Sequence, residues 1–303
     1  MSRSQRFDTI SFLSDYGSGD EFVGVVKSVI RAISPDTFVM DITHDIAPHD
    51  VRGGGLALAR SAQYLNPGVV LGVVDPGAAT ERRNVAIEVG DGASILVGPD
   101  NGLFASAVAL VGGATAAVSL TNPDYHLETH HGLAPLDAGR DIYAPVAAHL
   151  CSGVPLDEFG PSVDPGLLVP GVLPVSEFED DTLVAEVLWI DRFGNVQLNI
   201  GADDLMVMPE HLRIEFDGGG RSLARVTAFD AIGPGAVGML VDSYGLMALA
   251  VQRGSASAEL GLHEGDAIRL VPADGGGEGS DRGAVTSVSL SSKPAPQDTP
   301  TQP

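Results

Sequence analysis

An aspartate and an arginine seven residues apart are the side chains best placed to act on a ligand. Asp75 follows an apolar, β-branched run, residues 69–74, which is typical of a strand buried on both faces. The carboxyl end of such a strand is where open α/β sheets bind their ligands. Arg82 follows the Asp-Pro-Gly turn and can fold back over it. The pattern predicts a functional loop, although a solvated surface turn capped by the aspartate would use the same residues.

A second carboxylate, Asp15, ends the short apolar stretch 10–13 and precedes a helical pattern. At the carboxyl end of a strand, this side chain can accept two hydrogen bonds from a ribose diol. A helix N-cap is the alternative role for an aspartate at this position.

The elements that would position these carboxylates are those of an α/β domain followed by an all-β domain. We expect further strands at residues 38–42, 85–89 and 95–97, and helices at 51–64 and after Gly139. Prolines and glycines crowd residues 161–174, and short alternating stretches separated by Gly-rich turns begin at Leu183. The predicted organisation is an α/β domain with a central, mostly parallel sheet at 1–165, a linker at 166–182, a smaller all-β domain at 183–271 and a disordered tail at 272–303.

The histidines and the single cysteine do not indicate a metal centre. Pro48 interrupts any helix that could make the four potential ligands around it converge, namely His44, Asp45, His49 and Asp50. The histidines of the loop 121–139 are expected to be solvated. Cys151 lies in an apolar helical pattern that is typical of a core residue. We therefore expect neither a metal nor another cofactor.

The composition excludes some partners. The formal net charge is −23, from 40 acidic and 17 basic residues, so the chain lacks the Lys and Arg patches that bind nucleic acid. No charged-then-apolar leader opens the sequence and no run of eighteen apolar residues occurs in it. We expect a cytoplasmic protein without a membrane partner.

Eight segments stand out in order along the chain: FLSDYG, DITHDIAPHDVRGG, VVDPGAATERR, GPDNGL, GRDIYAP, IDRFGNVQLNI, DSYGLMALA and ELGLHEGD. Together they resemble the S-adenosylmethionine hydroxide adenosyltransferase family, which also contains the fluorinase and chlorinase enzymes. The resemblance extends from about Ile10 to Val271. It implies an N-terminal α/β domain, a smaller C-terminal β-barrel domain, and a homotrimer whose sites lie between the N-terminal domain of one subunit and the C-terminal domain of the next.

In that family a nucleophile attacks the ribose C5′ of S-adenosylmethionine and expels methionine. The resemblance implies that water attacks here and gives adenosine, with Asp75 and Arg82 as the catalytic residues. It also implies six substrate-binding residues: Asp15 at the ribose hydroxyls, Asp191 and Ser243 at the amino-acid end of methionine, Asn195 and Phe229 at adenine, and Gly139, which leaves room for the ligand. A turn residue or a core ring is the alternative role in the barrel.

One position departs from the family pattern, because Ala138 stands where a histidine is expected. Asp137, His130 or His131 could take its place, a hypothesis that rests on their closeness in the sequence. A protein that binds S-adenosylmethionine or adenosine without turnover is one alternative function. A halide-using enzyme is another. The pattern of the halogenases has a tyrosine at the position of Asp75, and a carboxylate at this position disfavours the binding of a desolvated halide anion.

Overall fold

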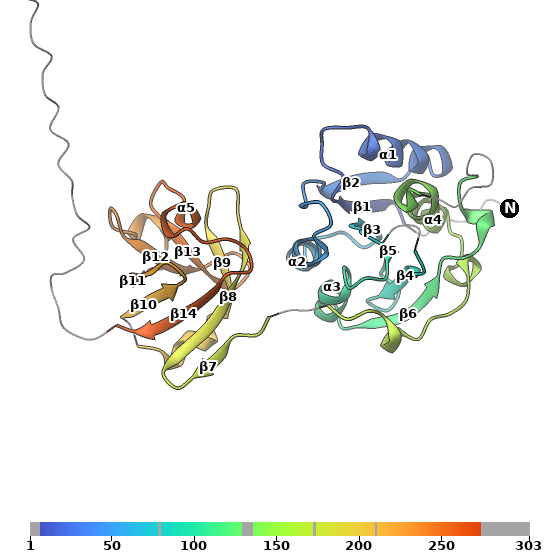
Figure 1. Cartoon of the computed structure of the whole chain (residues 1–303). Helices are drawn as coiled ribbons and strands as arrows, with labels where there is room; N and C mark the ends of the chain where they lie inside the picture. The colour runs from blue at the N-terminus through green and yellow to red at the C-terminus, as the bar shows by residue number, and fades with distance from the viewer. Residues whose placement is uncertain (1–6, 78–79, 129–135, 172–173, 210, 274–303) are drawn as a thin grey trace, which may run out of the picture.

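The chain forms two domains, each built on one β-sheet (Figure 1). The structure is a computed structural model that describes residues 7–77, 80–128, 136–171, 174–209 and 211–273. The predicted tail lies outside the described residues from 274 onward. The fold class predicted from the sequence is confirmed: an α/β domain precedes a closed β-barrel.

The N-terminal sheet has the strand order β2-β1-β3-β5-β4-β6. Its strands are β1 (Thr9–Ser14), β2 (Phe38–Thr43), β3 (Val69–Val73), β4 (Asn84–Val89), β5 (Ser94–Pro99) and β6 (Ala114–Ser119). Strands β2, β1, β3 and β5 are parallel to one another, and β4 pairs antiparallel with both β5 and β6. The sheet is therefore mostly parallel with an antiparallel edge, and β3 lies at its centre with every residue buried.

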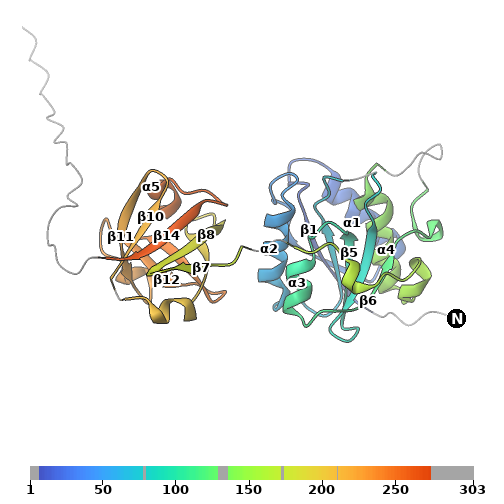
Figure 2. The same ribbon diagram turned by 60° about the horizontal axis from the view of Figure 1, so that its bottom comes forward.

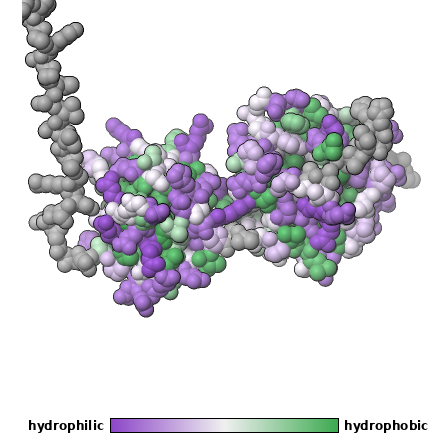
Figure 3. Space-filling model, viewed as in Figure 1, coloured by the Kyte–Doolittle hydropathy of each residue, from purple (hydrophilic) through white to green (hydrophobic). Residues whose placement is uncertain are grey.

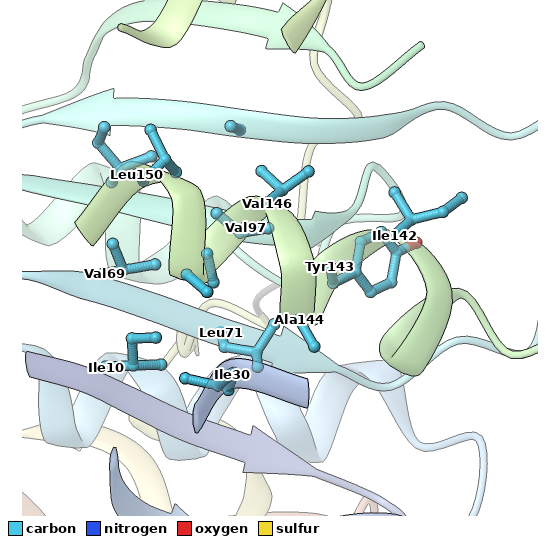
Figure 4. Close-up of a cluster of buried hydrophobic side chains, with 14 of the residues drawn as sticks. Ile10, Ile30, Val69, Leu71, Val97, Ile142, Tyr143, Ala144, Val146 and Leu150 are labelled. Atoms are coloured by element: carbon cyan, nitrogen blue, oxygen red, sulfur yellow. The ribbon is translucent and has the colours of Figure 1, made fainter. Parts of the chain in front are cut away.

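Helices cover both faces of this sheet (Figure 2). They are α1 (Phe22–Ile33), α2 (Val51–Ala62), α3 (Ala105–Leu110) and α4 (Ala144–Cys151). Because side chains alternate along a strand, Val69 and Leu71 pack against α1 and α4, whereas Val70 packs with α2 and α3. Figure 4 shows the first of these cores, in which Ile30 of α1 and Val146 of α4 lie over the strands.

A π-helical turn, Gly139–Tyr143, leads directly into α4. Cys151 at the end of α4 is fully buried, as the helical pattern predicts, and burial raises the pKa of its thiol to about 12. A thiol with so high a pKa is not a nucleophile at neutral pH.

The C-terminal sheet closes on itself because β14 pairs with β8 as well as with β10. Its strands are β7 (Glu177–Glu179), β8 (Thr182–Ile190), β9 (Val196–Gly201), β10 (Leu212–Phe216), β11 (Gly219–Arg225), β12 (Val237–Val241), β13 (Leu246–Val251) and β14 (Ala267–Pro272), with one short helix, α5 (Ala256–Leu260). Strand β7 pairs with β8 and lies within the stretch that we interpreted as a linker. The exact domain boundaries stay a prediction.

Two arginines of α2 contact the barrel. Arg52 Nη1 lies 2.5 Å from Glu186 Oε1, and the Arg60 guanidinium lies 4.0 Å from the centre of the Trp189 ring. Hydrophilic and hydrophobic residues are interspersed over the face of the molecule seen in Figure 3. Among the described residues, no helix has both the length and the apolar character to cross a bilayer.

Candidate functional site

The loops that follow β1 and β3 lie side by side at the carboxyl edge of the N-terminal sheet. The backbone N–H of Asp15 donates to the carbonyl of Val73 over 3.1 Å. The Asp15 carboxylate accepts a hydrogen bond from the backbone N–H of His49, with Oδ2 at 2.9 Å. His49 has a φ of 70°, a conformation that costs a non-glycine residue of order 1 kcal/mol or more.

Asp75 and Arg82 form a buried ion pair, which the sequence predicted as two neighbours on one loop. Arg82 Nη2 donates to Asp75 Oδ2 over 2.5 Å, and the two side chains are 12% and 7% exposed. The other carboxylate oxygen, Oδ1, is buried and has no hydrogen-bond partner among the described residues. Burial raises the pKa of Asp75, although Arg82 and a hydrogen bond from Tyr143 act in the opposite direction.

The Tyr143 hydroxyl contacts both members of this pair, and the sequence did not identify Tyr143 as a site residue. It is fully buried, and its hydroxyl lies 3.0 Å from Arg82 Nη2, 3.2 Å from Asp75 Oδ2 and 2.6 Å from Asn84 Oδ1. Burial raises the pKa of Tyr143, so the hydroxyl stays protonated. The available signal was a tyrosine inside an apolar helix start, because a buried phenol needs a polar partner.

The neighbouring loop 98–102 supports the end of β3. The Asn101 amide donates to the carbonyl of Val74 over 2.9 Å. Arg83 turns away from Asp75 and binds the buried Asp100, with Nε 2.9 Å from Oδ2. The two adjacent arginines therefore have different roles, and only Arg82 reaches the carboxylate at the strand end.

One cavity of about 330 Å³ is lined by Asp15, Asp75 and Gly139, while the roles that the resemblance implies for them stay predictions. A Cβ added to Gly139 would overlap the hydroxyl oxygen of Tyr16, so a larger residue there would require the Tyr16 side chain to shift. Asp137 lines the same cavity.

Tyr16 and Asp137 are joined across this cavity. The Tyr16 hydroxyl donates to Asp137 Oδ1 over 2.7 Å, and the Arg140 backbone N–H reaches the same oxygen over 3.2 Å. Burial and the Asp137 charge raise the pKa of Tyr16, so its hydroxyl remains a donor. Ala138 is buried in the cavity wall, and His130 and His131, proposed as replacements for the missing histidine, lie outside the described residues.

The barrel carries the second group of predicted residues in the turn between β8 and β9. Asp191 Oδ1 accepts from the backbone N–H groups of Phe193 and Asn195 over 2.8 and 2.9 Å. Its Oδ2 accepts from the Asn195 side-chain amide over 2.7 Å. The turn role that we considered as the alternative is thus present, and any ligand-binding role of these residues stays a prediction.

A cavity of about 640 Å³ lies beside this turn and contains Asn195, Phe229 and Phe193. Phe229 is 52% exposed and Phe193 is 73% exposed. Exposed aromatic rings of this kind provide stacking surfaces. Ser243 is exposed in the turn between β12 and β13 and is not part of this lining.

In the part of the chain that the structure describes, no group of three or more His, Cys, Asp or Glu side chains is arranged to hold a metal ion. The four ligand candidates around Pro48 are used differently. His44 Nδ1 lies 2.8 Å from the Ser14 hydroxyl, and Asp50 caps α2 by accepting from the Gly53 N–H over 2.8 Å.

Comparison with known proteins decides the family. The model of the S-adenosylmethionine hydroxide adenosyltransferase N-terminal domain matches residues 10–160, and that of the C-terminal domain matches 185–269. The chain belongs to this family. It is 44% identical over 261 residues to the (R)-S-adenosyl-L-methionine hydrolase of Salinispora tropica, covering 86% of this chain and 97% of that protein.

A second hydrolase and a solved structure match over a similar share of the chain. The (R)-S-adenosyl-L-methionine hydrolase of Thermus thermophilus is 39% identical over 86% of this chain and 99% of its own length. The crystal structure of a conserved protein from Thermotoga maritima aligns with a TM-score of 0.77 at 32% identity, covering 86% of this chain and 99% of that one. The fluorinase of Nocardia brasiliensis is a more distant relative, 27% identical over 69% of this chain and 78% of its own.

Proposed function

We propose that this protein hydrolyses S-adenosylmethionine to adenosine and L-methionine by attack of water on the ribose C5′. The observation that carries this proposal is the buried Asp75–Arg82 pair, whose carboxylate lines one cavity with Asp15. A site that only held the ligand would have no need of a desolvated ion pair at this edge of the sheet. The hydrolase names of relatives at 44% and 39% identity support the same reaction.

Asp75 acts during the attack rather than before it. Water has a pKa of about 15.7 and an ordinary aspartate about 3.9, so complete deprotonation beforehand would cost about 16 kcal/mol. Asp75 therefore orients the water and accepts its proton as the bond from oxygen to C5′ forms and the bond from C5′ to sulfur breaks. Arg82 holds the carboxylate and stabilises the hydroxide character that develops on the oxygen.

The leaving group makes a cofactor unnecessary in this proposal. The sulfonium takes the electron pair of the breaking bond and becomes a neutral thioether, so no metal is needed to stabilise it. Alignment of oxygen, C5′ and sulfur supplies much of the remaining acceleration. Asp75 provides the proton acceptor, so a histidine at position 138 is not required.

Two choices of substrate follow from the site and the relatives. We infer that water is used rather than halide, because a carboxylate close to a desolvated anion costs several kcal/mol in a closed site. The relatives' names specify the (R) sulfonium epimer, and we extend that preference to this protein. Incubation with a mixture of epimers should leave the (S) form behind.

We further propose a homotrimer with sites between subunits. The cavity with Asp75 is lined only by residues of the N-terminal domain, and the cavity with Asn195 only by residues of the barrel, among the described residues. Each domain therefore offers one part of a nucleoside site. A site shared between subunits would bring the two parts together. Action in the cytoplasm stays a prediction from the sequence.

Product analysis tests the proposed reaction. Purified protein is incubated with a mixture of the (R) and (S) epimers of S-adenosylmethionine in water enriched in oxygen-18, with and without chloride. Labelled adenosine from the wild type, and its loss in Asp75→Asn, would support the hydrolase. Intact (R) epimer bound to the protein after long incubation would overturn it in favour of a binding protein, and a chlorinated nucleoside would overturn it in favour of a halogenase.

A further inference from the structure

The cavity beside Asp75 has an excess of negative charge. Three carboxylates line it, those of Asp15, Asp75 and Asp137, and of its lining residues only His49 can become cationic. Arg82 offsets the charge of Asp75, but no comparable cation pairs with the other two among the described contacts. The guanidinium of Arg140, which is close in sequence, binds Asp141 instead, over 2.6 and 2.9 Å.

Asp137 is held in a fixed position rather than free in solvent. Two donors, the Tyr16 hydroxyl and the Arg140 N–H, converge on its Oδ1. Tyr16 is itself fixed by stacking on Phe22, with ring centres 5.2 Å apart. These contacts occupy one carboxylate oxygen and restrict the orientation of the group, so its charge acts at a defined place.

A second observation indicates that the cavity is built for a polar ligand. Asp75 is only 7% exposed, and its Oδ1 is buried without a partner among the described residues. A buried carboxylate oxygen without a hydrogen bond is costly, which a bound donor would relieve. The cavity therefore combines an unsatisfied acceptor with two carboxylates that form no direct ion pair within the described part of the chain.

We propose that Asp137 is a specificity-determining residue that recognises the positive charge of a sulfonium nucleoside and so makes the cavity prefer S-adenosylmethionine to its neutral thioether counterpart. This inference rests on the proposed function. Hydrolysis converts the sulfonium into a thioether and releases one proton, so the reaction removes the charge that Asp137 attracts. Substrate then binds more tightly than either product, which favours release.

The test compares ligands that differ in charge. Inhibition constants are measured for S-adenosylhomocysteine, the neutral thioether, and for sinefungin, in which a protonated amine replaces the methylsulfonium, together with KM for S-adenosylmethionine. Asp137→Asn keeps the shape and the acceptor for Tyr16 but removes the charge. We expect it to weaken sinefungin and raise KM about tenfold while S-adenosylhomocysteine changes less than about twofold.

Two control variants separate local charge from other effects. Asp157→Asn removes the same charge from an exposed position in the short helix Leu156–Phe159 and should change neither inhibitor. Asp137→Glu keeps the charge and should restore much of the preference for the cation. An unchanged ratio of the two inhibition constants in Asp137→Asn, whether both inhibitors weaken equally or neither weakens, would overturn the inference. Wild-type protein that neither hydrolyses S-adenosylmethionine nor binds it would instead overturn the proposed function.

Discussion

Asp75 is a carboxylate that the fold removes from water and pairs with a single cation. Its partner Arg82 is also buried, and an ion pair in this environment depends on its geometry, because removing one partner leaves an uncompensated charge. The Arg82 guanidinium meets three groups, since Nη1 binds the carbonyl of Arg83 and Nη2 binds Asp75 and Tyr143. A planar guanidinium can satisfy these directions together.

Replacing Arg82 by lysine should therefore impair catalysis although the charge is kept. A lysine ammonium cannot reach all three acceptors in this arrangement, so the carboxylate loses its orientation. We expect kcat to fall about a hundredfold, measured as adenosine formed at saturating S-adenosylmethionine. The matched control is Arg83→Lys, which alters the contact with Asp100 but not with Asp75. An equal fall in both variants would contradict a specific role for Arg82.

Tyr143 should set the acid limit of activity. Its hydrogen bond lowers the pKa of Asp75, whereas burial raises it. In Tyr143→Phe one of the lowering effects is lost while Arg82 still lowers the pKa, so the carboxylate is protonated at a higher pH than in the wild type and stops accepting a proton there. The acid limb of kcat/KM should move up by about one pH unit.

The control for this shift is Tyr64→Phe, at an exposed position outside the cavity. Its pH profile should match that of the wild type. A uniform fall in rate in Tyr143→Phe, without movement of the acid limb, would mean that Tyr143 only supports the structure.

At the scale of elements, β3 and β5 approach too closely for a side chain at Gly98. A Cβ there would overlap the Gly72 carbonyl oxygen and the Phe104 ring. Gly98→Ala should lower the free energy of unfolding by about 3 kcal/mol, because backbone cannot move aside as a flexible side chain can. Urea denaturation measures this, and Gly19→Ala, with no atom near the added Cβ, should be nearly neutral. Similar midpoints for the two variants would contradict this account of the packing.

At the scale of the whole molecule, the shared site makes a prediction about mixed oligomers. Asp75→Asn disables the N-terminal part of the site, and Asn195→Ala disables the barrel part. Each variant alone should be inactive or nearly so. If sites lie between subunits, co-refolded mixtures should regain about a quarter of the wild-type activity through sites with two intact parts. Mixtures as inactive as their components, with mixed oligomers detected by native mass spectrometry, would place each site within one chain.

The sequence by itself determined the elements and the loops that carry the chemistry. Most of the apolar run 69–74 forms β3, which ends two residues before Asp75, and the strands expected at 85–89 and 95–97 form as β4 and β5. Periodicity and turn residues are local properties, so they can be read without the fold. The ordered motifs, including the glycine at 139, identified the family.

Only the tertiary structure decided which side chains complete the site. Tyr143 meets Asp75 across 68 positions of sequence, and Tyr16 meets Asp137 across 121. Neither contact follows from a local pattern, because each depends on how the segment that leads into α4 packs against the loops that follow β1 and β3. The sequence could not separate a binding role from a turn role for Asp191, because the same carboxylate satisfies both descriptions until its partners are known. Burial and pairing are properties of the folded chain, and they supply the pKa and orientation on which the proposed chemistry depends.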